Sequence, residues 1–274
     1  LPSAPPGTTV NVASGTQTQA QAGYALFSGT APLTKTGAGT LVVNAANTIT
    51  GSTTVQQGTL QLANAAALAS STIVPLAGGT MSLAPYLQTT VGGLAPNAGG
   101  LVNLGNGLVT VASGLSATDL VTAIKAGRGD GSWTGTSGIT SSVAATDVAA
   151  SIPRSVGWLD NGDGSVTAAF AAPGDTNIDW QVDILDAGNF LTLGKYDTGL
   201  PSTWLEGDFN YDGVVDIQDA ADFFGTGLYD TGNYNTPVGA SGIAAVPEPS
   251  TLALLASSLA VAAGLATRSR RSCR

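Results

Sequence analysis

A repeat of about twenty residues in the first hundred positions constrains the fold of this chain more than any other feature. A glycine followed by a short β-prone segment recurs four times, and the leading apolar residues of these segments are Leu41, Leu60, Met81 and Leu101. One unit of this size cannot bury its own apolar face, whereas stacked units bury it against one another. The repeat therefore predicts a mainly β N-terminal region with the stacked coils of a β-solenoid. A β-sandwich rich in threonine and glycine is the alternative.

Within this region the segment 33–62 carries the parts of a longer motif. A Gly-x-Gly-Thr-Leu strand at Gly37–Leu41 precedes an Asn-Thr turn at Asn47–Thr48, a strand at Gly51–Val55 and a closing Gly-Thr-Leu at Gly58–Leu60. In this order the parts resemble the autotransporter-associated β-strand repeat. The resemblance implies a right-handed parallel β-helix, as in secreted passenger regions.

Acidic residues are concentrated in one part of the chain. Between Asp175 and Asp230 there are twelve acidic residues against one base, Lys195. Phosphate binding needs clustered Lys and Arg, so this block argues against nucleic acid as a partner and in favour of cations. The chain has no histidine and one cysteine, Cys273, which excludes histidine-based catalysis, histidine metal ligands and an intramolecular disulfide.

A twelve-residue acidic segment occurs twice, at Asp175–Asp186 and Asp208–Asp219. Both copies place oxygen-bearing side chains at positions 1, 3, 5, 9 and 12. Calcium takes about six to eight oxygen ligands, and this spacing wraps the side chains around one point while position 7 offers a backbone carbonyl. We therefore expect two calcium sites, with a solvated acidic turn as the alternative for each copy. The expected ligands are Asp175, Asn177, Asp179, Gln181, Asp183 and Asp186 in the first loop, and Asp208, Asn210, Asp212, Val214, Asp216 and Asp219 in the second.

The two loops differ at position 6, where the sharp turn favours a residue that can adopt a positive φ angle. Gly213 occupies this position in the second loop and Trp180 in the first. The strain of a left-handed tryptophan is on the order of 1–2 kcal/mol, so the first site is expected to bind calcium more weakly. Val182 and Val215 at position 8 are expected to form a β-bridge between the loops or to pin each loop to the core. Helical segments are expected after position 8 of each loop.

The block from Gly174 to Tyr229, with two loop–helix halves and Asp at position 12, resembles a type I dockerin. The resemblance implies a small α-helical module that folds on calcium and docks onto a cohesin, often beside polysaccharide-degrading enzymes. The positions that contact a cohesin are small and hydroxylic in that family, whereas here they are Ile184-Leu185 and Ile217-Gln218. The partners to consider are therefore a cohesin-like protein, another surface protein or a polysaccharide.

The C-terminal tail has three consecutive parts. Val246-Pro247-Glu248-Pro249-Ser250 precedes an uncharged apolar run, Thr251–Thr267, and four arginines follow within 268–274. As a helix the run is just long enough to cross a hydrocarbon core, with the arginines on the cytoplasmic side. This order matches the PEP-CTERM protein-sorting signal. The match implies export, transient membrane insertion through a single transmembrane helix, and processing by an exosortase near the Pro-Glu-Pro sequence.

The region between the repeat and the acidic block has two local signals. Ser116 or Thr118 can cap a short helix that extends to Ala126, and the Asn-Gly and Asp-Gly pairs within Asp160–Gly164 predict the turn of a β-hairpin. The expected divisions of the chain are an autotransporter-like repeat region (1–115), a helix-and-hairpin connector (116–170), a dockerin-like module (171–235), a linker (236–245) and a sorting signal (246–274).

Together these features favour an exported bacterial surface or extracellular-matrix protein, in the cell envelope or secreted, with a calcium-folded interaction module. The alternative is a polysaccharide-degrading protein, a glycoside hydrolase or lyase, or a fragment of one. Such an enzyme needs a pair of carboxylates or a similar constellation. Before residue 171 the acids are scattered or lie in turns, and they are Asp119, Asp130, Asp147, Asp160 and Asp163. We therefore expect no catalytic residues in this chain.

Overall fold

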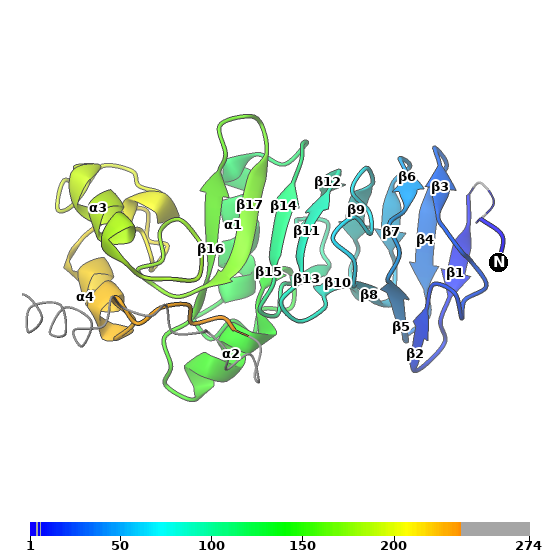
Figure 1. The fold of residues 1–274 in the computed structure, drawn as a ribbon, viewed down its shortest axis with the longest axis horizontal. Coiled ribbons are helices and arrows are strands. Elements are labelled where there is room, and N and C mark those ends of the chain that lie inside the picture. Colours follow the sequence, from blue (N-terminus) through cyan, green and yellow to red (C-terminus); the bar gives the residue numbers. More distant parts are fainter. Residues whose placement is uncertain (4, 6, 237–274) are drawn as a thin grey trace, which may run out of the picture. The chain divides into compact units, whose positions relative to one another are not determined.

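Stacked strands occupy the N-terminal part of the chain, and helices gather toward its C-terminal part (Figure 1). The computed structural model describes residues 1–3, 5 and 7–236. The transmembrane helix expected at Thr251–Thr267 lies outside the described residues. Among the residues that are described, none of the helices has the length and apolar character needed to cross a membrane.

Two parallel sheets form a β-solenoid, because successive strands along the chain alternate between them. The first sheet contains β1 (Thr9–Asn11), β4 (Leu33–Thr36), β7 (Thr53–Val55), β9 (Thr72–Pro75) and β12 (Gly93–Leu94). The second contains β2 (Thr16–Thr18), β5 (Thr40–Val43), β8 (Gly58–Leu62), β10 (Gly79–Leu83), β13 (Leu101–Asn103) and β15 (Gly138–Thr140). A short parallel pair lies beside them, β3 (Ser28–Gly29) and β6 (Thr48–Ile49). The predicted solenoid is confirmed, and the sandwich alternative is wrong.

The inward-facing residues of successive coils stack in register. Leu41 pairs with Leu60, which pairs in turn with Met81. Met81 pairs with Val102, and all four side chains are buried. Leu101, expected as the leading apolar residue of the fourth unit, instead lies half-buried on the outer side, so that expectation is wrong by one position.

The corners between coils depend on two kinds of residue. Gly58 has a φ angle of +68°, and a Cβ there would lie 2.4 Å from the carbonyl oxygen of Gly37, which leaves no room for another side chain. Lys35 is fully buried, and its Nζ donates to the carbonyls of Thr36 and Gly37 at 2.8 Å and of Gln57 at 3.1 Å. The lysine therefore joins the backbones of two neighbouring coils.

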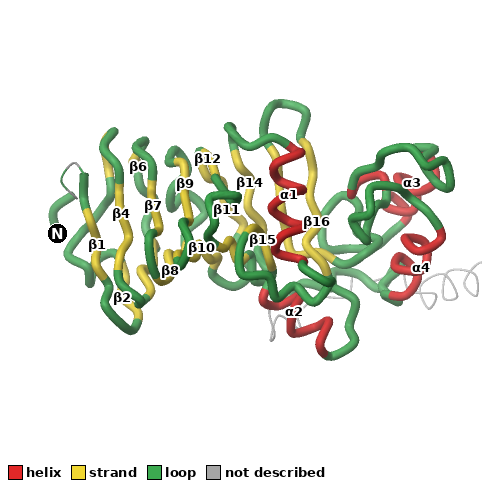
Figure 2. Tube along the Cα trace, turned by 180° about the vertical axis from the view of Figure 1, so that it is seen from behind, coloured by secondary structure: helices red, strands yellow, loops and turns green. Residues whose placement is uncertain are grey.

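Two helices and an antiparallel hairpin close the C-terminal end of the solenoid. The first helix is N-capped by Ser116, as expected, and packs on β15 of the last coil (Figure 2). The expected hairpin is confirmed around Asp160–Gly164, whereas the second helix was not predicted. The elements of this cap are α1 (Ala117–Arg128), α2 (Ser142–Ala149), β16 (Ser155–Asp160) and β17 (Val166–Ala171), with β11 (Gln88–Val91) and β14 (Leu108–Val111) in the same sheet as the hairpin.

A small helical module follows the hairpin, as expected. It contains α3 (Ile184–Thr192), a 3-10 turn η1 (Trp204–Glu206) and α4 (Ile217–Gly225). Aromatic residues attach it to the cap: the Trp204 side chain is fully buried, and the Tyr211 hydroxyl donates to the carbonyl of Val156 in β16. Leu1–Asn235 consequently form one compact unit.

Candidate calcium-binding module

The two halves of the module hold each other in a reciprocal arrangement. Val182 of the first loop pairs with Tyr229, which follows α4, and Val215 of the second loop pairs with Tyr196, which follows α3. In both pairs the residue after the tyrosine donates its N–H to the valine carbonyl at 2.8 Å. Both valines are buried. The expected bridge between the two loops is therefore absent, and each valine holds its loop to the segment behind the other helix.

The carboxylates at positions 9 and 12 define where the helices begin. Asp183 caps α3 by accepting from the N–H of Leu185 at 2.8 Å, and Asp186 accepts from the N–H of Asp183 at 2.9 Å. The second loop repeats this capping box with Asp216 and Asp219. A capping box satisfies backbone N–H groups that the first helical turn leaves without partners. The spacing that suggests metal ligands thus also fixes the direction in which each helix leaves its loop.

Positions 3 and 5 form a chain of hydrogen bonds inside each loop. Asn177 Oδ1 accepts from the N–H of Asp179 at 3.0 Å, and the Asn177 amide donates to Asp179 Oδ2 at 2.9 Å. Asn210 and Asp212 make the same two contacts at 2.7 and 3.0 Å. The position-5 carboxylate of each loop also accepts from the N–H of position 7. These bonds curl both loops in the same way and bring positions 3, 5 and 7 together.

Position 1 is where the loops differ most. Asp208 Oδ2 accepts from the N–H of Gly213 at 3.1 Å, and its Oδ1 is buried with no hydrogen-bond partner. In the first loop, Asp175 Oδ2 accepts from the N–H of Trp180 at 3.0 Å and from the hydroxyl of Tyr234. Asp175 Oδ1 accepts from position 5 of its loop at 3.2 Å. A buried carboxylate oxygen without a donor is costly, so Asp208 is the position that most needs a cation.

The electrostatics of the two position-1 aspartates also favour a cation. The pKa of Asp175 is raised to about 8, chiefly by burial. The hydrogen bond from Tyr234 lowers the pKa, and the neighbouring Asp186 carboxylate raises it. Burial raises the pKa of Asp208 to about 7, and the neighbouring Asp219 carboxylate adds to this rise. Both carboxylates are therefore hard to ionise near neutral pH unless positive charge is close.

Position 6 adopts the left-handed conformation that the sequence predicted for it. The φ angle is 68° at Trp180 and 98° at Gly213. The Trp180 indole N–H donates to the carbonyl of Phe170 in β17 at 2.8 Å, which anchors the strained residue. Position 4 is also left-handed, with φ angles of 53° at Ile178 and 65° at Tyr211, and this was not predicted.

Tyr234 is a site residue that the sequence did not reveal. It lies after α4, yet its hydroxyl donates to Asp175 and accepts from the N–H of Ala172 at 2.9 Å. Its ring packs edge-on against Phe170, and the Arg154 guanidinium lies 5.1 Å from the ring centroid. No spacing rule connects Tyr234 to the first loop, because the contact depends on how the module folds back on the hairpin.

The acidic side chains of the described residues are not arranged as the ligand shell of a metal ion. Within the described part of the chain, no group of three or more His, Cys, Asp or Glu side chains is placed to hold a metal ion. Instead, most of the loop carboxylate oxygens accept from N–H groups of their own loop, as Asp186 Oδ1 does from Thr176 at 2.8 Å and Asn177 at 3.3 Å. The described loops thus carry the expected acidic ligands without bringing three of their carboxylates around one point.

Comparisons with known proteins address the two ends of the chain. The passenger-associated-transport-repeat matches residues 33–62, the segment that resembled the autotransporter repeat and that folds as coils of the solenoid. The PEP-CTERM protein-sorting motif matches residues 245–271, outside the described residues. Neither match covers the duplicated loops, so the resemblance to a dockerin stays a prediction. No curated protein and no solved structure matches the chain. The two matches indicate an exported protein associated with the cell envelope.

Proposed function

We propose that this chain is an envelope-associated protein whose C-terminal module binds two calcium ions and serves as an interaction module. The buried, unpartnered Oδ1 of Asp208 is the observation that carries the calcium assignment. It lies at position 1 of the second loop, where the N–H of Gly213 already donates to the other oxygen of the same carboxylate. A divalent cation bound there supplies the positive charge that a buried carboxylate otherwise lacks.

The residues present fit calcium in particular. The two loops offer carboxylate, amide and backbone oxygens and neither histidine nor cysteine, which is the donor set of a hard cation. In the second loop the ligands would be Asp208, Asn210, Asp212, the carbonyl of Val214, Asp216 and Asp219. In the first loop they would be the residues at the same positions, from Asp175 to Asp186.

The second site is proposed to be the tighter of the two. In the first loop, Asp175 already accepts from Tyr234 and from two N–H groups, and these donors compete with a cation for the same oxygens. Trp180 adds backbone strain at position 6, whereas Gly213 adds little. Both differences weaken the first site.

Isothermal titration of the full chain with calcium tests the assignment. Two binding events of unequal affinity are expected, and Asp208→Ala should abolish the tighter one. Asp160→Ala is the matched control, because Asp160 is the exposed last residue of β16, next to the hairpin turn and outside both loops. Absence of calcium binding, or an Asp208→Ala variant that binds like the parent chain, would show the proposal to be wrong.

The sorting motif supports a proposal about the route to the envelope. The chain would be inserted through Thr251–Thr267, recognised by an exosortase and cut near Pro247-Glu248-Pro249, and its role there would be binding and structural rather than catalytic. A cohesin-like protein, another surface protein or a polysaccharide would be the partner of the module. Intact mass measurement on the native protein tests the processing step: a species that retains Arg268 to Arg274 contradicts it.

A further inference from the structure

Exposed hydrophobic side chains are concentrated on the helical module. Ten of the thirteen large hydrophobic residues that are exposed in the described part of the chain lie between Ile184 and Tyr229. Four of them surround one groove: Leu191 is 70% exposed, Tyr196 42%, Ile217 69% and Phe224 74%. Clustered exposed apolar residues of this kind mark interaction sites, whereas isolated ones need no explanation.

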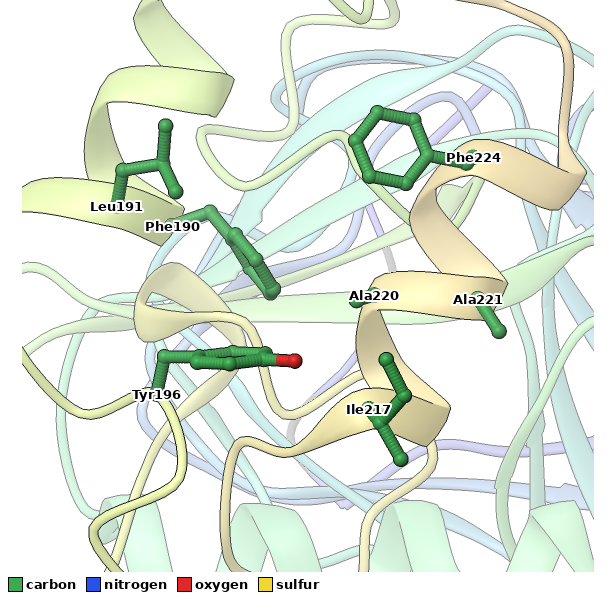
Figure 3. Close-up of a pocket in the computed structure, with 7 residues that line it drawn as sticks. All are labelled: Phe190, Leu191, Tyr196, Ile217, Ala220, Ala221 and Phe224. Atoms are coloured by element: carbon green, nitrogen blue, oxygen red, sulfur yellow. The ribbon is translucent and has the colours of Figure 1, made fainter.

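The groove runs between α3 and α4 and has a volume of about 400 Å³. Figure 3 shows Phe190, Leu191 and Tyr196 along one side of it and the α4 residues, Ile217 to Phe224, along the other. The residues that α4 contributes, from Ile217 to Phe224, have the spacing i, i+3, i+4 and i+7, so they line the groove over two helical turns. The hydroxyl of Tyr196 is the one polar side-chain atom among the lining residues. The groove thus lacks the several polar groups that orient a small ligand.

The backbone hydrogen bonds of an occupant limit what can bind in this groove. An extended peptide in this groove would place its N–H and C=O groups against apolar side chains, where they find no partners. A helix satisfies those groups internally and presents apolar side chains at the same two-turn spacing as α4. The shape therefore favours a helix that lays an apolar face into the groove.

The formal charge of the module that carries the groove limits the occupant further. The block from Asp175 to Asp230 has eleven net negative charges, of which two calcium ions would offset four. Its single base, Lys195, lies 3.5 Å from Glu206 and donates to the carbonyl of Pro201, so it offers no positive charge to a partner. A second copy of the chain would bring the same acidic surface against itself. A basic partner would be attracted instead.

We propose that the groove between α3 and α4 binds a basic amphipathic helix of a partner protein. Leu191, Tyr196, Ile217 and Phe224 contact the apolar face of that helix, and Lys and Arg flanking this face meet the acidic surface of the module. This inference rests on the proposed interaction role and names the class of partner. It does not require that calcium be the ion that the loops hold.

Fluorescence anisotropy on the full chain in calcium buffer tests the proposal. The probe is a labelled peptide with Leu at i, i+3, i+4 and i+7 and Lys elsewhere. It should bind at least tenfold more tightly than a scrambled peptide of the same composition, and than a peptide with Glu in place of Lys. Equal affinity for the patterned and scrambled peptides, or no binding of the patterned one, overturns the proposal.

Variants locate the contact. Phe224→Ser and Leu191→Ser should each weaken binding at least tenfold, and both residues are exposed, so the fold should persist. Leu200→Ser, which removes a 52% exposed leucine outside the groove, should leave the affinity unchanged. An equal loss in all three variants, or self-association of the chain that Phe224→Ser abolishes, contradicts a basic helix as the occupant. Titration with calcium alone reports the loop sites separately, so a failure of calcium binding is distinguishable from a failure of the groove.

Discussion

At the residue scale, Asp175 and Asp208 show how equivalent positions acquire different properties. Their sequence contexts match at positions 1, 3, 5, 9 and 12 of the loops, and the spacing predicted both as calcium ligands. The structure then separates them, because Tyr234 reaches Asp175 from outside the loop and Asp208 has no such donor. Sequence could predict two similar loops that each lead into a helix, since that pattern is local. It could not predict Tyr234, since that contact depends on tertiary folding.

The raised pKa values of these two aspartates predict a pH-dependent stability in the absence of calcium. The folded protein holds their protons up to about pH 8 for Asp175 and about pH 7 for Asp208, whereas an aspartate in the unfolded chain has its ordinary pKa of 3.8. The folded state thus binds protons more tightly, and this stabilisation is full below about pH 4 and falls progressively until the pH passes about 7 for Asp208 and about 8 for Asp175. In chelator, the melting temperature should be higher at about pH 5.5 than at about pH 8.5. Asp208→Asn should reduce the difference, and equal melting temperatures in the parent chain would contradict the argument.

Trp180→Gly is expected to have opposite effects on the stability of the fold and on the calcium affinity of the first site. Trp180→Gly removes the strained left-handed tryptophan from the first loop, so the affinity of the first site should rise. The same change removes a buried side chain and its hydrogen bond to Phe170, at a cost of about 3–5 kcal/mol by analogy with Trp→Ala. Calorimetry and urea unfolding in chelator measure the two effects. A variant with unchanged affinity at the first site would refute the strain argument.

At the scale of elements, position in the coil matters more than the identity of the residue. In each repeat unit the inward-facing residue lies two places after the glycine, as Leu60 does after Gly58 and Met81 after Gly79. The same count from Gly100 gives Val102, the residue that is buried in the fourth unit. Choosing the first apolar residue after the glycine gave Leu101 instead. Helix α2 had no comparable periodic pattern, and its sequence did not predict it.

The contacts of the buried Lys35 predict that this residue stabilises two neighbouring coils of the solenoid. Burial lowers the pKa of its ammonium, yet three backbone carbonyls accept from it. Lys35→Met keeps most of the apolar stem and leaves these carbonyls without their donor. The free energy of unfolding should fall by about 2–3 kcal/mol in urea titrations. Hydrogen bonds to charged groups contribute about 1.5–3 kcal/mol each, but methionine avoids the cost of burying an ammonium, which offsets part of the loss of three bonds. Lys125→Met, on the exposed side of α1, should change it little.

At the scale of the whole molecule, the solenoid cap and the loops share a packed junction. Trp204 donates its indole N–H to the carbonyl of Asp175 at 2.7 Å, and its ring lies against Gly157 of β16. The sequence predicted the solenoid and the module separately, because each has its own periodicity. It could not predict that residues 1–235 form one compact unit, because the contacts that join them link residues far apart in the chain.

Because this junction packs the loops against the cap of the solenoid, we expect calcium to stabilise the solenoid as well as the module. Calcium that binds only the folded state raises the free energy of unfolding of every part that unfolds together with the loops. The parent chain should therefore show one calorimetric transition, and its melting temperature should rise with calcium. Gly157→Ala should uncouple the two parts, because a Cβ at residue 157 would lie 2.7 Å from Ile178 Cγ2 and 2.8 Å from the Trp204 ring. The variant should then show two transitions, of which only one responds to calcium. Gly188→Ala in α3 controls for the substitution itself, because a Cβ there meets nothing within 4 Å and the φ angle of Gly188, like that of Gly157, is not positive. A solenoid transition in the parent chain that ignores calcium would mean that the junction transmits no stability from the loops to the coils.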